Sequence, residues 1–234
     1  MPVTAAAAAV AVALALLGGA AANASFTVDA PFLRDSSGRA VFFHGVNAVW
    51  KLAPDYFPPS SVYRTGAVPP ADSYFDERDA AFLAANGLTT VRLGVMWAGV
   101  EPEKDQFDES YLDRIEDLVD MLGKEQILVL LDFHQDMYNE LYEGQGFPPW
   151  ATPSGPLPPN LPFFGFPGGY FLNPATMHAF DRMWLDADGL WAEYRAFWRH
   201  IADRFKAKTN LLGYDLMNEP WPGTQWPSCV NTQG

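Results

Sequence analysis

Four short runs of β-branched and other apolar residues set the organisation of the chain. They occupy residues 39–46, 89–97, 126–133 and 211–217. Runs of this length and composition predict β-strands. The third run, QILVLLDF, is apolar almost throughout, as expected of a parallel strand that is covered on both faces. The sequence therefore predicts a sheet whose strands are parallel and largely buried.

Helical segments are predicted between these strands. Residues 74–85 form one, and residues 108–122 form another, in which apolar side chains recur every three and four positions until Gly123 ends the pattern. A third helical face runs through residues 177–205, with a turn expected at 186–189. The alternating order of strands and helices predicts an α/β protein with a parallel sheet.

Two architectures fit this order, a doubly wound sheet and a (β/α)8 barrel. A nucleotide-binding doubly wound sheet carries a glycine-rich phosphate loop after its first strand. Here the sequence HGVN at 44–47 occupies that position. The nucleotide-binding version is therefore disfavoured.

Polar or aromatic side chains follow or lie in all four predicted strands. In a barrel the reacting groups lie at the carboxyl ends of the strands, and polar groups are costly to bury there without a purpose. We therefore expect a site at this edge. Its candidate residues, strand by strand, are Asn47, Trp50 and Lys51; Arg92 and Trp97; Asp132, His134, Gln135 and Asp136; and Asn218, Glu219 and Trp221.

Two of these segments carry a resemblance to a known family. The sequence DLMNEP at 215–220 resembles the acid/base motif of glycoside hydrolase family 5, a family of retaining glycosidases, and the Arg92 and His134 segments match its second and third strand signatures. LDFHQDMY at 131–138, together with NEPWPG at 218–223, is similar to the endoglycoceramidases of that family. Trp50-Lys51 fits as well. The resemblance extends from about Phe32 to the last residue.

The resemblance implies a role for Glu219 as the general acid and base. Such a group should need a raised pKa, which we expect from burial and from a negatively charged nucleophile nearby. The other implied roles concern the sugar. Asn218 would bind the 2-hydroxyl, Arg92 would lie beneath the nucleophile, His134 and Asp136 would bind further hydroxyls, and Lys51 and Trp221 would contact substrate. Asp136 capping a loop and Lys51 lying plainly on the surface stay open as alternatives.

The family's nucleophile is a glutamate at the end of strand seven of a closed barrel, which takes about 250 residues. We therefore expect residues 25–234 to be the N-terminal part of the catalytic domain. They would form strands one to four, the N-terminal half of a (β/α)8 TIM barrel. On this expectation the chain is an N-terminal fragment that is inactive alone.

The implied activity of the complete enzyme is cleavage of the β-bond between glycan and ceramide in glycosphingolipids. Another β-glucanase or β-glucosidase of family 5 and a non-catalytic glycolipid-binding pseudoenzyme are the alternatives. Residues 145–174 contain nine prolines and could form the lipid side of the site, or could merely pack over the barrel helices. Their aromatic residues are Phe147, Trp150, Phe163, Phe164, Phe166, Tyr170 and Phe171.

Composition and the first residues add limits on partners and location. The net charge is −13, from 15 Lys and Arg and 28 Asp and Glu, which argues against a nucleic-acid partner, and 49% hydrophobic residues exclude intrinsic disorder. Residues 1–24 contain an uncharged Ala-rich run and end in Ala-Asn-Ala, which predicts a cleaved signal peptide and secretion. An uncleaved run would anchor the protein at the cell surface.

Cys229 is the single cysteine of the chain, which excludes a zinc site built from several cysteines. An exported protein with one cysteine is expected to pair it. The resemblance suggests a partner cysteine downstream of Gly234. We expect no cofactor and no metal. The expected partner is a glycolipid substrate, with transient contact to a membrane surface, and the full-length protein is expected to be a monomer.

Overall fold

A computed structural model of the chain describes residues 26–51, 53, 56, 74–153 and 165–230. The predicted signal peptide at 1–24 and the predicted lipid-contacting Phe163 and Phe164 lie outside the described residues. None of the helices in the described part of the chain combines the length and the apolar character that crossing a bilayer requires.

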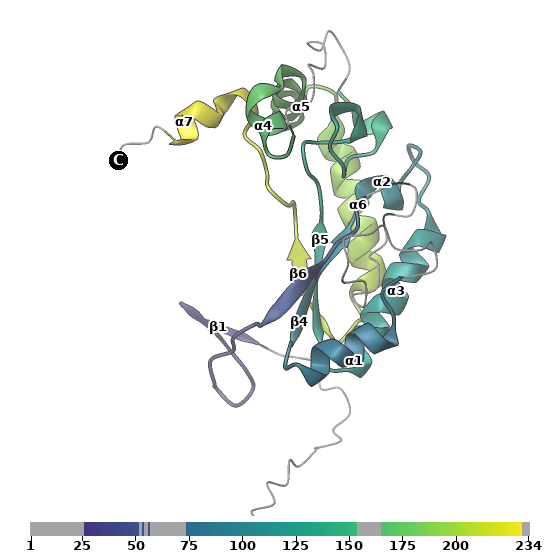
Figure 1. Ribbon diagram of the computed structural model, residues 1–234, viewed down its shortest axis with the longest axis vertical. Helices are drawn as coiled ribbons and strands as arrows, with labels where there is room; N and C mark the ends of the chain where they lie inside the picture. Colours follow the sequence, from purple (N-terminus) through teal and green to yellow (C-terminus); the bar gives the residue numbers. More distant parts are fainter. Residues whose placement is uncertain (1–25, 52, 54–55, 57–73, 154–164, 231–234) are drawn as a thin grey trace, which may run out of the picture.

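A four-stranded parallel sheet forms the centre of the structure (Figure 1). Its strands lie side by side in chain order. They are β3 (Gly45–Ala48), β4 (Thr90–Val95), β5 (Leu128–Phe133) and β6 (Leu211–Asp215). The prediction of four parallel strands is thus confirmed, with the last three strands inside the predicted ranges.

The first predicted strand, at 39–46, is wrong in its bounds. A hairpin of β1 (Thr27–Asp29) and β2 (Phe32–Arg34) precedes the sheet. The stretch that follows pairs with this hairpin: Ala40 forms a bridge with Arg34, and the Val41 N–H donates to the Leu33 carbonyl at 2.9 Å. Only residues 45–48 form a strand of the parallel sheet, because residues 39–41 pair with the hairpin instead.

The helices predicted between the strands are present. The main ones are α1 (Glu77–Ala85), α3 (Glu109–Lys124), α5 (Pro174–Trp184) and α6 (Leu190–Phe205). Shorter ones are α2 (Trp97–Val100), α4 (Gly168–Leu172), α7 (Trp226–Val230), η1 (Glu140–Tyr142), η2 (Pro149–Ala151) and η3 (Gly223–Gln225). The predicted turn at 186–189 separates α5 from α6.

Gly123 does not end α3, contrary to the sequence prediction. The helix continues through it to Lys124. A Cβ at Gly123 would lie 3.1 Å from the side-chain amide of Asn210, which donates to the carbonyls of Val119 and Ile127 at 2.8 and 3.2 Å. The glycine is therefore explained by a close approach between the end of α3 and the residue before β6.

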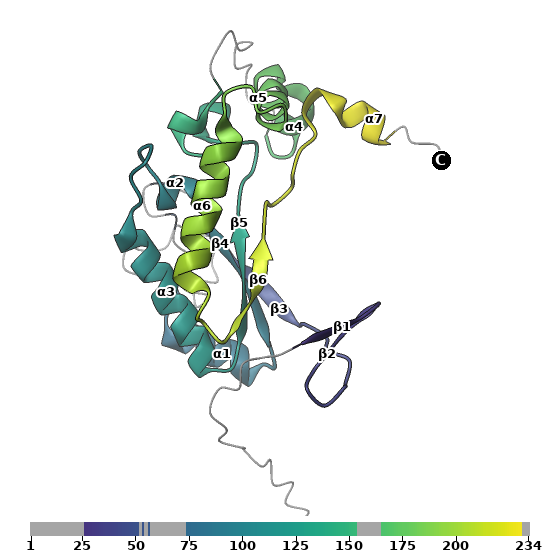
Figure 2. The same ribbon diagram turned by 180° about the vertical axis from the view of Figure 1, so that it is seen from behind.

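The helices α1, α3 and α6 lie on one face of the sheet (Figures 1 and 2). No described helix packs on its opposite face. A doubly wound sheet would carry helices on both faces. The arrangement is that of part of a (β/α)8 barrel, whose helices form only an outer ring. The structure thus supports the predicted barrel over the doubly wound alternative.

Aromatic rings fill the layer between the sheet and α6. Trp97, Phe133, Phe147 and Phe197 are each at most 1% exposed. Their ring centres are 5.0–6.0 Å apart in the contacting pairs. Phe147 was predicted as part of a lipid-contacting stretch, but it belongs to this core.

Truncation of Phe197 tests the contribution of this aromatic layer. Phe197→Ala in the complete protein should lower the free energy of unfolding by about 3–5 kcal/mol, because it removes a buried ring and leaves a cavity. The matched control is Phe42→Ala, whose ring is 77% exposed and which should change stability by at most about 0.5 kcal/mol. Urea unfolding monitored by fluorescence measures both. Similar losses for the two variants would contradict this account of the core.

Candidate active site

The register of the sheet brings the predicted site residues to one edge. Asn47 lies opposite Arg92 on neighbouring strands, and Asp132 lies opposite Asp215. After the strands end, the Asn218 N–H still donates to the Phe133 carbonyl at 2.9 Å. Because all four strands are parallel, their carboxyl ends meet at the same edge of the sheet, where barrel enzymes carry their reacting groups.

Arg92 reaches from β4 across β5 to the end of β6. Its guanidinium lies 2.8 Å from a carboxylate oxygen of Asp132 and donates to Asp215 at 2.8 and 2.9 Å. It also donates to the side-chain oxygen of Asn218 at 3.0 Å. The planar, forked guanidinium can hold several acceptors at fixed angles. Arg92 therefore fixes the relative positions of three predicted strand ends.

Asp132 is among the site residues predicted from the sequence, whereas Asp215 is not. Both lie inside the motifs that carry the family resemblance, at the ends of their strands. The signal that could have found Asp215 is its position three residues before the predicted Asn218 on the same strand end. Asp215 accepts hydrogen bonds from Arg92, and Asp132 forms an ion pair with it, so both act on the site by positioning charges.

His134 lies buried between two carboxylates. Its Nδ1 is 2.7 Å from Asp132, and its Nε2 is 3.5 Å from Asp136. Burial alone would lower the pKa of His134, but the hydrogen bonds to these two carboxylates outweigh it and raise that pKa. Burial raises the pKa of Asp132 although His134 and Arg92 act in the opposite direction.

Asp136 lies between the side chains of Lys51 and His134. The Lys51 ammonium pairs with the same carboxylate oxygen that faces His134. Burial would raise the pKa of Asp136, but His134 and Lys51 hold it below its usual value. Asp136 thus faces the site, which disfavours the loop-capping alternative. Lys51 is brought into the site although its side chain is 41% exposed.

These contacts form one continuous series of alternating charges, which we call the charge chain. Every neighbouring pair in it consists of a cationic or protonatable nitrogen and a carboxylate. Like charges are thereby kept apart, and each buried carboxylate has an opposite partner. In order, its members are Lys51, Asp136, His134, Asp132, Arg92 and Asp215.

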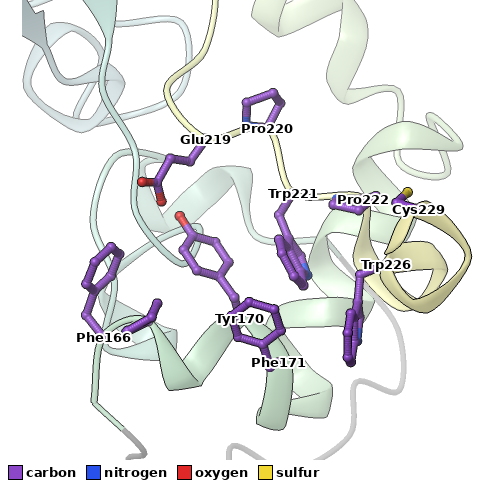
Figure 3. A pocket seen from close by; sticks show the side chains of 10 residues that line it. Phe166, Tyr170, Phe171, Glu219, Pro220, Trp221, Pro222, Trp226 and Cys229 are labelled. Atoms are coloured by element: carbon purple, nitrogen blue, oxygen red, sulfur yellow. The ribbon is translucent and has the colours of Figure 1, made fainter. Parts of the chain in front are cut away.

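Glu219 follows the charge chain on the loop after β6. Its side chain is exposed, so the expected burial of this carboxyl group is wrong for the described structure. The physical reason is its place on the loop after the last strand of the described sheet, where among the described residues α4 approaches it from one side. Figure 3 shows its carboxylate turned toward the hydroxyl of Tyr170. Its backbone is left-handed, with φ 44°.

An aromatic cleft of about 650 Å³ opens beside Glu219 (Figure 3). Trp221, a predicted substrate contact, lies in its wall, with its ring centre 5.2 Å from that of Tyr170 and 4.8 Å from that of Phe171. The residues lining the cleft are Phe166, Pro167, Tyr170, Phe171, Glu219, Pro220, Trp221, Pro222, Trp226 and Cys229. The aromatic stretch at 145–174 is therefore divided, since Phe166, Tyr170 and Phe171 line the cleft whereas Phe147 and Trp150 pack with Trp97.

The helix α5 holds the loop that forms one wall of the cleft. The Asp181 carboxylate accepts hydrogen bonds from the backbone N–H and the hydroxyl of Thr224 at 2.9 and 2.8 Å. The indole N–H of Trp184 donates to the Trp221 carbonyl at 2.6 Å. The two walls of the cleft are thus tied together through α5.

Cys229 is exposed at the edge of the cleft. Its predicted disulfide partner lies beyond Gly234, so the bond stays a prediction. Among the described residues, no group of three or more His, Cys, Asp and Glu side chains is placed to hold a metal ion.

Known proteins are similar to this chain in sequence and in fold. The family model "Cellulase (glycosyl hydrolase family 5)" matches residues 70–233. Endoglycoceramidase I of Rhodococcus hoagii is 37% identical over 203 residues, and endoglycoceramidase of Cyanea nozakii is 35% identical over 211. These alignments cover 86% and 82% of this chain but 38% and 40% of the relatives. The chain therefore spans about two fifths of the length of the curated relatives it matches.

Solved structures give the same result. Endo-glycoceramidase II from a Rhodococcus species superposes with a TM-score of 0.69 at 35% identity, over 82% of this chain and 42% of the other. The crystal structure of an endogalactoceramidase superposes with a TM-score of 0.69 at 27% identity, over 85% of this chain and 45% of the other. The part-barrel architecture of the chain is thus shared with these enzymes.

The raised pKa of His134 predicts a pH-dependent stability. A protonated group with a raised pKa in the folded state stabilises the protein fully below its unfolded pKa of about 6.5, and this stabilisation is lost as the pH rises through the folded pKa. The free energy of unfolding should therefore fall above about pH 6.5, and His134→Gln should remove that part of the fall. Urea unfolding at a series of pH values measures it.

The control is His44→Gln, because the His44 side chain is exposed and lies outside the charge chain. This variant should keep the pH dependence of the wild type. A His134→Gln variant whose stability falls with pH as steeply as that of the wild type would show that His134 is not held protonated by its two carboxylates.

Proposed function

The chain belongs to glycosyl hydrolase family 5, and we propose that the complete protein is a retaining glycoside hydrolase that cleaves the β-linkage between glycan and ceramide in glycosphingolipids. Relatives that are 31–37% identical carry the name endoglycoceramidase. A glycosphingolipid joins a hydroxyl-rich glycan to two long hydrocarbon chains. The enzyme that cleaves it must therefore bind a polar and an apolar group on the two sides of one bond.

The observation that carries the proposal is the position of Glu219 between two unlike surfaces. On one side lies the charge chain, whose carboxylates and cations can bind sugar hydroxyls. On the other side lies the aromatic cleft, which offers apolar surface to a lipid. An acid at this boundary is placed to protonate the oxygen that links the two parts of such a substrate.

Glu219 acts in this proposal as the general acid in the first step and as the general base in the second. It protonates the leaving ceramide oxygen while a second carboxylate attacks the anomeric carbon, and it then takes a proton from the water that hydrolyses the glycosyl-enzyme intermediate. Asp132, Asp136 and Asp215 are each paired with a cation or with His134. These three carboxylates position the site, and the family resemblance implies that the nucleophile is a further glutamate of the complete enzyme, so we expect this chain to be inactive alone.

Asn218 and Lys51 complete the sugar side of the proposed site. Asn218 is held by Arg92, and its amide also donates to the Gln135 carbonyl at 3.0 Å, so it can present itself to a sugar hydroxyl in a fixed orientation. Lys51 adds a cation at the edge of the charge chain. Secretion, transient contact with a membrane surface and a monomeric state remain predictions from the sequence.

Replacing the acid tests the role of Glu219. In the complete protein, Glu219→Gln should lower turnover of the glycolipid by about 10²–10⁴-fold, because the amide can neither donate nor accept the transferred proton. A substrate with a strongly activated leaving group should lose much less in kcat/KM. Azide should partly restore the second step, since it attacks without a general base. Steady-state kinetics on both substrates measures these effects.

The matched control is Glu143→Gln. Glu143 is also exposed and left-handed, with φ 62°, but it lies after η1, away from the cleft. It should retain wild-type kinetics. Near wild-type turnover of the glycolipid by Glu219→Gln would exclude the acid/base assignment.

Changing the cleft tests the lipid side of the site. The double variant Phe171→Ser and Trp226→Ser removes two rings whose centres are 5.2 Å apart. Each buried methylene contributes about 0.8 kcal/mol, so losing contact with two or three methylenes should lower kcat/KM on a ceramide-linked substrate roughly 15- to 60-fold. A soluble aryl glycoside of the same glycan should be affected by about twofold or less.

The control for this variant is Phe82→Ser, which removes a 48% exposed ring from α1 at the other end of the structure. Equal losses on both substrates would mean that the cleft only stabilises the fold. Cleavage of β-glucans together with inactivity on every ceramide-linked substrate would support the family 5 β-glucanase alternative, and binding without any cleavage would support the pseudoenzyme.

A further inference from the structure

Gln135 is a fully buried polar residue at the centre of the site, with no exposed surface. Its side-chain amide nitrogen donates to two backbone carbonyls, those of Asn218 at 2.7 Å and Glu219 at 2.8 Å. It thus connects the loop after β5 to the loop after β6. The proposed mechanism gives this side chain no role, because it does not reach the exposed surface where a sugar would bind.

The orientation of the Gln135 amide is fixed by its partners. Its side-chain oxygen accepts from the Tyr138 N–H at 3.1 Å, while its nitrogen faces carbonyls, so the reverse orientation would oppose acceptor to acceptor and donor to donor. Space is also limited, because a Cβ at Gly146 would lie 2.4 Å from the Gln135 Cβ. The amide is therefore held firmly on the side of the β5 loop.

The two carbonyls that Gln135 binds flank the Cα of Glu219. The Asn218 carbonyl belongs to the peptide plane before that Cα, and the Glu219 carbonyl belongs to the plane after it. The orientations of these two planes define φ and ψ of Glu219. One amide group thus fixes both backbone dihedral angles of the proposed acid/base.

This restraint matters because Glu219 is in the left-handed region, with φ 44°. Residues other than glycine seldom adopt this region, and they keep it only where the surrounding structure holds them there. If the backbone of Glu219 relaxed to a negative φ, the direction of its Cα–Cβ bond would change. The carboxyl group would then move away from the boundary between the charge chain and the aromatic cleft.

We propose that Gln135 is a positioning residue that aims the Glu219 carboxyl group at the glycosidic oxygen by holding its two flanking peptide planes. The inference rests on the proposed function. It assigns to Gln135 no contact with substrate and no proton transfer. Its effect should appear only in steps that need proton transfer by Glu219.

The test compares two substrates in the complete protein, a phenyl and a dinitrophenyl β-glycoside of the same glycan. Gln135→Met keeps the length of the side chain and removes both donors. It should lower kcat/KM on the phenyl glycoside by about 10²-fold, the scale of a misplacement of about 1 Å. The dinitrophenyl glycoside needs little protonation of its leaving group and should lose only about threefold.

A second variant covers the case in which Gln135→Met does not fold, as judged by its thermal unfolding. Gln135→Glu keeps the shape and the oxygen that accepts from Tyr138, and it retains at most one donor toward the two carbonyls. The same selective loss on the phenyl glycoside is expected. Equal losses on the two substrates, or wild-type values on both, would overturn the proposal in either variant.

Asn210→Leu is the matched control. The Asn210 amide also donates to two backbone carbonyls, at 2.8 and 3.2 Å, but at the amino end of β6. Its loss should lower thermal stability and leave the ratio of the two kcat/KM values unchanged. A wild-type protein that cleaves neither glycoside would contradict the proposed function, and the role of Gln135 would fall with it. An active wild type with an unselective Gln135→Met variant would contradict the role of Gln135 alone.

Discussion

The guanidinium group of Arg92 joins the carboxyl ends of three neighbouring strands, and the geometry of the site depends on it. It lies on β4 and contacts a carboxylate from β5, a carboxylate from β6 and the side chain of Asn218 beyond β6. Removing a partner from such a partly buried group leaves an uncompensated charge, which is strongly destabilising. His134 depends on the same group indirectly, because Asp132 is a partner of both. The arrangement of the polar half of the site thus depends on the Arg92 guanidinium and on the strand register that places it beside its partners.

The site has a polar half and an aromatic half, which are held together by different kinds of interaction. Its polar half is specified by direction, since hydrogen bonds and ion pairs weaken rapidly when their angles change. Its aromatic half is specified by shape and apolar area, which tolerate small shifts. Glu219 lies where they meet, on a loop whose backbone is fixed by Gln135 on one side and whose continuation, at Trp221 and Thr224, is tied to α5 on the other. The backbone at the boundary between the two halves is therefore restrained.

Much of the fold could be predicted because it is encoded in local periodicity. The parallel strands and the long helices follow from patterns within a single segment, and the polar strand ends followed from their place after those segments. The errors concern interactions between distant segments. Residues 39–41 pair with the hairpin, Gly123 makes room for a side chain before β6, and Asp215 acquires its importance through Arg92. The left-handed backbone of Glu219 belongs to the same class, since no local pattern specifies it.

The attachment of the loop after β6 to α5 has a consequence for the way such a site can diversify. Residues of α4 and just before it line one wall of the cleft, and residues 219–222 with Trp226 and Cys229 line the other. Asp181 and Trp184 of α5, the helix that follows α4, bind this second segment at Thr224 and Trp221. An insertion or exchange confined to one of these segments would break contacts made by the other. The two segments therefore form a single exchangeable module, and recombination that alters the shape of this cleft must transfer them together.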